Sequence, residues 1–76
     1  MQKGAIMPNY IINKNSDEKG FNEVHNTAIC SHLPEIYNQV DLGQHTDENA
    51  AVDYAKRIGW RNADGCKYCC PNAHRG

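Results

Sequence analysis

The sequence predicts a small α+β domain that is stapled by a zinc ion. Two observations indicate this fold class. Short apolar runs alternate with turn residues ahead of a single helical stretch, and four cysteines and four histidines stand in a chain of only 76 residues. A hydrophobic core alone leaves so short a chain marginally stable, so a metal or disulfide staple is expected. With one Phe and one Trp, the chain also offers little large apolar material for a core.

Three antiparallel strands are predicted ahead of the helix. Residues 10–13 form a short apolar run, and the polar stretch 15–20, which ends in glycine, is typical of a turn. Residues 21–25 then return as the second strand of a hairpin. Residues 38–44 alternate between polar and apolar side chains, which indicates a third strand.

One helix is expected over about residues 47–58. Thr46 or Asp47 can cap its first turn, and Gly59 suits the positive φ that often ends a helix. Four apolar residues recur at helical spacing and form one stripe: Ala51, Tyr54, Ala55 and Ile58. This stripe is predicted to cover the small sheet.

Composition and charge exclude several classes of protein. A net charge of -1 provides no global basic field for nucleic acid or an anionic membrane. No run approaches the ~20 apolar residues that span a bilayer, and the first ten residues lack the apolar stretch of a secretory signal. We therefore expect a cytoplasmic protein with a tail over residues 1–9 and a single domain over residues 10–76. In a reducing compartment, clustered cysteines indicate metal or redox chemistry rather than structural disulfides.

The motif Cys66-Lys67-Tyr68-Cys69 is the strongest indication of a metal site. Two intervening residues allow both thiolates to reach one tetrahedral ion, and Gly65 is expected to supply a positive φ just before them. A redox dithiol is the alternative. Such motifs normally open a helix after a strand, whereas this one follows the only predicted helix. The position therefore favours a metal knuckle.

A closed zinc site needs two further ligands. Cys30 is the only cysteine outside the C-terminal cluster, which makes it the third ligand by elimination. The residues alone leave the fourth position open, and there are four candidates: His25, His32, Cys70 and His74. His25 and Cys30 form an H-x4-C pair at the end of a predicted strand. Cys70 directly follows Cys69 and is expected to point away from the ion, and His74 stands one helical turn after Cys70.

A series of features in order along residues 10–71 resembles the Ada-type metal-binding domain, the zinc-binding methyl-acceptor domain of bacterial alkylation-repair regulators. The strongest parts are the strand with Val40 and Leu42, the Ala-rich helix, the Gly59-Trp60-Arg61 step and the final C-x2-C pair. The resemblance implies a small zinc-stapled fold for most of the chain.

In that family two cysteine pairs hold the zinc ion, C-x3-C early and C-x2-C late. The resemblance implies that Cys66 and Cys69 are the late pair, that Cys30 is the second early ligand and that His25 stands near the first. The early spacing is one residue longer here. The first early cysteine accepts the methyl group in the family, so a histidine there implies that methyl-acceptor activity is absent. Zinc would then be structural, in a closed shell of four ligands.

We therefore expect a structural zinc-binding module that acts by binding a nucleic acid or protein partner and is not an enzyme. Cations and aromatics that suit such a partner stand close together in the sequence: Lys56, Arg57, Trp60, Arg61 and Lys67. The simpler interpretation of Trp60 is a core residue beside the metal site. The alternative function is a thiol-based redox or metal-responsive protein, in which Cys70 is the reactive thiol and His74 its imidazole partner.

Overall fold

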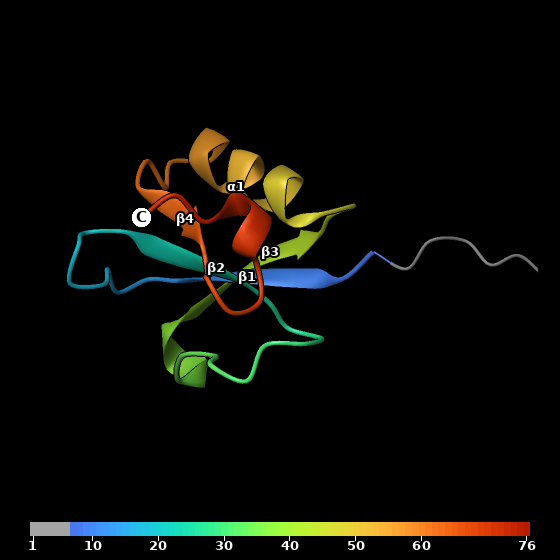
Figure 1. Cartoon of the computed structure of the whole chain (residues 1–76), viewed down its shortest axis with the longest axis horizontal. Helices are drawn as coiled ribbons and strands as arrows, with labels where there is room; N and C mark the ends of the chain where they lie inside the picture. Colours follow the sequence, from blue (N-terminus) through green and yellow to red (C-terminus); the bar gives the residue numbers. More distant parts are fainter. Residues whose placement is uncertain (1–6) are drawn as a thin grey trace, which may run out of the picture.

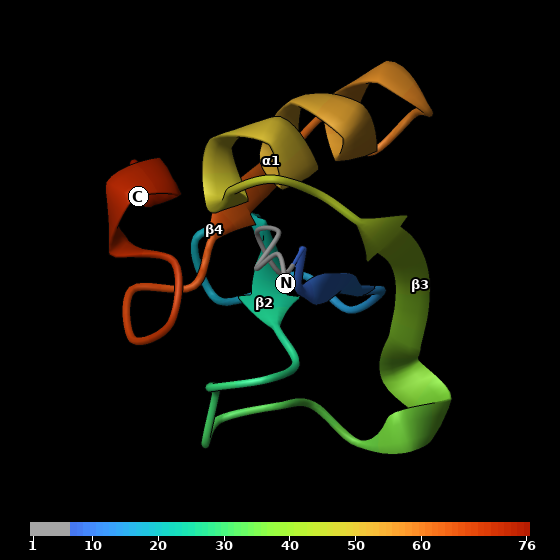
Figure 2. The same ribbon diagram turned by 90° about the vertical axis from the view of Figure 1, so that its right-hand side faces the viewer.

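The computed structural model describes residues 7–76 and shows a four-stranded sheet with one α-helix packed across it. The elements are β1 Asn9–Asn13, β2 Asn22–Asn26, η1 Ile36–Asn38, β3 Gln39–Gln44, α1 Glu48–Arg57, β4 Ala63–Gly65 and η2 Pro71–Ala73. Helix α1 lies along one face of the sheet (Figure 1), and the loop from β2 to β3 runs on the other side (Figure 2). The predicted α+β class with one main helix is confirmed in the described part of the chain.

Strand β4 is the main departure from the predicted sheet. The strand order is β3-β1-β2-β4, with β1 antiparallel to both of its neighbours and β4 parallel to β2. The sheet is therefore mixed, where three antiparallel strands were predicted. β4 has only three residues, Ala-Asp-Gly, and no β-branched or aromatic side chain that would mark it as a strand. Its pairing with β2, distant in sequence, gives it this conformation.

The register of β1 and β2 divides their side chains between the two faces of the sheet. Ile12 lies opposite Val24, and both belong to the core beneath α1. Ile11 lies opposite His25, and because side chains alternate along a strand, this pair occupies the other face. The core on the helix side consists mainly of Tyr10, Ile12, Val24, Leu42, Ala51, Val52 and Ala55.

Helix α1 begins as predicted but buries a different stripe. The Asp47 side chain accepts a hydrogen bond from the Ala50 N–H at 2.8 Å, and Gly59 has a φ of 120° just after the helix. The buried helical residues are Ala51, Val52 and Ala55. Tyr54 and Ile58, which were predicted to face the sheet, are 37% and 50% exposed. The stripe prediction was thus right for Ala51 and Ala55 and wrong for Tyr54 and Ile58, because the helix approaches the sheet with its small residues and turns these large ones outward.

Within residues 7–76, no helix is long and apolar enough to cross a membrane. Residues 1–6 of the predicted tail lie outside the described residues. Asn9, the last residue of that predicted tail, already belongs to β1.

Candidate metal centre

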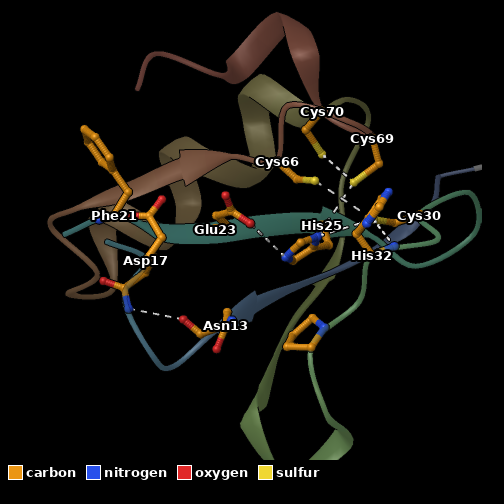
Figure 3. A network of polar contacts seen from close by, with 12 residues as sticks. Asn13, Asp17, Phe21, Glu23, His25, Cys30, His32, Cys66, Cys69 and Cys70 are labelled. Atoms are coloured by element: carbon orange, nitrogen blue, oxygen red, sulfur yellow. Dashed lines mark hydrogen bonds and ion pairs between the residues drawn. The ribbon is translucent and has the colours of Figure 1, made fainter. Parts of the chain in front are cut away.

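Four side chains converge at one end of β2 and β4: His25, Cys30, Cys66 and Cys69 (Figure 3). His25 lies on β2, Cys30 in the turn that follows it, and the other two in the loop after β4. Each residue offers one ligand atom, and these atoms all lie within 4.8 Å of one another. The structure thus brings together the four residues that the sequence predicts as ligands, and the group is compatible with a metal ion.

Three of the distances between these atoms are close to those expected around a single tetrahedral ion. His25 Nδ1 lies 3.4 Å from Cys30 Sγ and 3.9 Å from Cys69 Sγ, and the sulfurs of Cys30 and Cys66 are 4.0 Å apart. Zinc–ligand bonds of 2.0–2.3 Å at tetrahedral angles place two sulfurs about 3.8 Å apart and a sulfur and a nitrogen about 3.6 Å apart. The observed values lie within a few tenths of an ångström of this geometry. The imidazole presents Nδ1, not Nε2, to the sulfurs.

Local backbone pairing explains why residues so distant in sequence meet here. The Cys66 N–H donates to the Val24 carbonyl at 2.9 Å, which extends the β2–β4 pairing and carries Cys66 to the neighbourhood of His25. Asn26 forms the turn after β2, because its carbonyl accepts the Cys30 N–H at 3.0 Å and its side chain accepts the Ala28 N–H at 2.9 Å. Strand β4, which was not predicted, therefore positions Cys66, and the turn at Asn26 positions Cys30.

Backbone N–H groups surround the cysteine sulfurs. The Asn26 N–H donates to Cys69 Sγ at 3.3 Å, and the His32 N–H donates to Cys30 Sγ at 3.3 Å. The backbone N–H groups of Cys69 and Tyr68 offset part of the effect of burial on the pKa of the Cys66 thiol. Hydrogen bonds to a thiolate favour its charged form. Such donors suit sulfurs that carry negative charge in a buried place.

Gly65 has a different role from the predicted one. Positive φ values occur at three other glycines in the described chain, and Gly65 is not among them. A Cβ on Gly65 would lie 2.6 Å from the Cys70 carbonyl oxygen and 2.9 Å from Ala73 Cβ. The absence of a side chain therefore lets the loop that holds Cys66 and Cys69 fold back tightly on β4.

Burial sets the protonation of the ligand groups in the metal-free chain. Desolvation, with a smaller contribution from His32, lowers the pKa of His25 to about 4, so its imidazole is neutral and keeps a free lone pair at neutral pH. Burial also raises the pKa of the Cys66 and Cys69 thiols above their ordinary range. Thiols in this setting ionise when a cation replaces their protons. The group is suited to a metal ion rather than to free thiolates.

Cys70 and His74, the other candidates for the fourth position, lie outside the group of four. Cys70 is fully buried, and its sulfur lies 3.6 Å from Cys69 Sγ. The Cys70 side chain thus lies nearer to the metal ligands than predicted, since it was expected to point away from them. Burial raises the pKa of Cys70 to about 11, which keeps it a thiol. His74 Nδ1 donates to the Gly65 carbonyl at 2.9 Å and lies 3.3 Å from Asp64 Oδ2. Its imidazole is thus engaged with β4.

His32, the remaining candidate, lies outside the group as well. Its ring stacks on the Tyr68 ring with centroids 4.0 Å apart. Only its backbone N–H reaches the metal ligands, through Cys30 Sγ.

One contact of the site was not anticipated from the sequence. Glu23 Oε1 lies 3.7 Å from His25 Nε2, on the side of the ring away from the sulfurs (Figure 3). Burial, followed by the charge of Asp17, raises the pKa of Glu23. The signal that could have revealed this contact is the spacing of two along a strand, which places both side chains on one face.

The predicted contact surface has exposed cations but a partly buried aromatic. Lys56 and Arg57 are exposed in the last turn of α1, and Trp60 packs partly buried against the core. The Lys67 ammonium lies 5.3 Å from the centre of the exposed Tyr68 ring. Packing against the core, the simpler interpretation of Trp60, thus explains the buried part of its side chain and leaves the rest accessible.

No known protein family, curated protein or solved structure matches this chain in the comparisons. The resemblance to the Ada-type domain stays a prediction from the sequence.

Proposed function

We propose that this protein is a structural zinc-binding module that acts by binding a partner and is not an enzyme. The observation that carries the proposal is the convergence of His25, Cys30, Cys66 and Cys69, whose ligand atoms all lie within 4.8 Å of one another. Three thiolates and one imidazole form a donor set that zinc favours, and zinc closes structural sites with four protein ligands. A closed shell of this kind offers no position for water or substrate.

The chemistry of the site also supports a structural role over alkyl or redox transfer. Backbone hydrogen bonds to Cys30 and Cys69 spread the charge of these sulfurs and reduce their nucleophilicity. The family resemblance places His25 near the methyl-acceptor position, where an imidazole replaces the thiolate. A reactive Cys70 needs a nearby base, but the His74 imidazole donates to Gly65 instead. The thiol-based alternative therefore has less support.

The first experiment measures metal content and affinity in the purified, reduced protein. We expect one zinc ion per chain and, with Co²⁺ as a substitute, the visible absorption of a tetrahedral site with several thiolates. Alanine substitutions at His25, Cys30, Cys66 or Cys69 should each weaken zinc binding by about 100-fold or more, because each removes one of four bonds from a binding free energy of about 10–16 kcal/mol.

His32→Ala and His74→Ala are the matched controls, because each removes an imidazole near the site that lies outside the group of four. Both variants should keep one zinc ion with nearly unchanged affinity. Loss of zinc in the His74→Ala variant, together with retention of zinc in the His25→Ala variant, would contradict the proposed ligand set. A wild-type chain without stoichiometric zinc would contradict the proposed function.

The partner would be a nucleic acid or a protein that contacts the exposed cations at the end of α1 and in the knuckle. If the partner is single-stranded nucleic acid, its affinity should fall steeply with salt, because Lys and Arg contacts release counterions from phosphates. Titration of the zinc-loaded protein with a labelled oligonucleotide at two salt concentrations measures this. Absent or salt-independent binding would leave a protein partner as the supported case.

A further inference from the structure

Glu23 is a neighbour of the candidate metal centre whose contact with His25 the set of four ligands does not explain. It precedes His25 by two residues on β2, so the two side chains lie on the same face of the sheet. The Glu23 side chain is one-third exposed at 33%, whereas that of His25 is 2% exposed. The carboxylate therefore reaches from the solvent side to the one imidazole of the group.

The orientation of the His25 ring distinguishes its two nitrogens. Nδ1 lies 3.4 Å from Cys30 Sγ and 3.9 Å from Cys69 Sγ, whereas Nε2 lies 3.7 Å from Glu23 Oε1. A neutral imidazole carries one proton, and only the nitrogen without it can bind a metal ion. A carboxylate beside Nε2 favours the proton on that nitrogen. Nδ1 is then free to bind the ion.

We propose that Glu23 is a positioning residue of the metal centre. Its carboxylate accepts a hydrogen bond from the Nε2–H group of His25 and thereby holds Nδ1 toward the ion. This role rests on the proposed zinc site. An N–H···O bond of ordinary length, about 2.9 Å, requires Glu23 to approach by about 0.8 Å, which a partly exposed side chain can do. Carboxylates placed in this way behind a ligating imidazole fix its ring and raise its basicity.

The surroundings of Glu23 support His25 as its partner. Glu23 lines a polar hollow of about 260 Å³ together with Asp17, Glu18, Lys19, Lys67, His74 and Gly76. Among the described residues, His25 is the one basic side chain that comes within 4.0 Å of the Glu23 carboxylate. Glu18 shares the hollow and is exposed, so it provides a carboxylate of equal charge without this contact.

The test is zinc affinity in the reduced full chain, measured by competition with a chromophoric chelator. Glu23→Ala should weaken binding by about 10- to 100-fold. Glu23→Gln, which keeps an acceptor oxygen but not the charge, should give a smaller loss. Glu18→Gln is the matched control and should leave the affinity unchanged. The Co²⁺-loaded forms provide a second readout, because the ligand-field bands should shift in Glu23→Ala and not in Glu18→Gln.

A double-mutant cycle shows whether Glu23 acts through the imidazole. In a His25→Cys background no imidazole remains for Glu23 to orient, so Glu23→Ala should no longer weaken zinc binding. An equal loss in both backgrounds would overturn the proposal and indicate a general effect on folding. Unchanged affinity and Co²⁺ spectrum in Glu23→Ala would also overturn it while leaving the zinc site intact. Failure of the wild-type chain to bind zinc would refute the site itself.

Discussion

The two faces of strand β2 show two different ways of holding one small fold together. Val24 points toward α1 into a mainly apolar core that also includes Cys66 and Cys69, whereas His25 points to the other face and meets these cysteines and Cys30 at the end of the strand. The first region depends on apolar burial. The second depends on polar and ionisable groups whose burial is unfavourable without a counter-charge. Adjacent residues thus belong to regions with opposite chemistry.

The difference explains why the apolar region can be so modest. Its helix contributes two alanines and one valine, and the larger Tyr54 and Ile58 remain substantially exposed. A core of this size in a 76-residue chain yields little net stability after the entropy of folding is subtracted. The segments that carry Cys30, Cys66 and Cys69 have little regular structure. We infer that the proposed zinc ion holds them and that the apolar region cannot hold the fold alone.

Removal of the metal should have the largest effect on stability, because it tests whether the apolar region stays folded without the metal region. Zinc binding in small domains contributes about 10–16 kcal/mol, which is as large as the whole stability of about 5–15 kcal/mol typical of a domain. We therefore expect a strong chelator to unfold the reduced protein at room temperature. Loss of α1 helicity in circular dichroism, together with collapse of amide dispersion in NMR spectra, measures this.

Re-addition of zinc should restore the folded spectrum, whereas the Cys66→Ala chain should not respond to zinc. Retention of full α1 helicity after chelation would show that the apolar region is stable by itself. In that case the metal would order only the loops after β2 and β4.

The metal region was partly predictable from the sequence because its ligands follow short-range spacing rules. Two residues between Cys66 and Cys69 suffice to indicate a knuckle, and elimination identifies Cys30. The fourth position required long-range information. The choice of His25 over His74 depends on the parallel pairing of β4 with β2, which no local pattern in Ala-Asp-Gly indicates.

The apolar region was predictable in type and less so in detail. Spacing and capping gave the helix its bounds within about one residue, and Asp47 caps it as expected. The buried stripe depended on how closely α1 approaches the sheet, which favours Val52 over Tyr54. The contact of Glu23 with His25 lies within one strand, so the spacing of two residues along β2 was a local signal for it.

Gly65 tests the junction between the two regions and should give the next largest effect. In Gly65→Ala the new Cβ would lie 2.6 Å from the Cys70 carbonyl oxygen, so the backbone must move. We expect a loss of about 3 kcal/mol in the free energy of unfolding, at the upper end of overpacking costs. Urea denaturation of the zinc-loaded protein measures it, and zinc affinity should fall as well.

Gly20→Ala is the control for Gly65→Ala. Gly20 has a φ of 90° and open space around it, so an alanine there introduces backbone strain of about 1 kcal/mol without a clash. Equal effects of the two substitutions would show that close packing behind the knuckle is unimportant. A larger loss of stability in Gly65→Ala would show that close packing between β4 and the loop with Cys66 and Cys69 stabilises the fold.

Tyr10 should give the smallest of the three effects and probes the apolar region without disturbing the ligands. Burial, followed by the charges of Cys70 and Glu48, raises its pKa from 10.0 to about 12. The folded state therefore keeps a proton that the unfolded state loses, so stability is complete below pH 10 and falls between pH 10 and pH 12. At about pH 11 the loss should reach about 1.4 kcal/mol. Urea denaturation of zinc-loaded wild-type and Tyr10→Phe protein at about pH 9 and about pH 11 isolates this contribution, because only the wild type has the Tyr10 hydroxyl. An identical alkaline loss in both proteins would mean that Tyr10 ionises as freely as an exposed tyrosine, and that the core beneath α1 admits water even while the metal centre is intact.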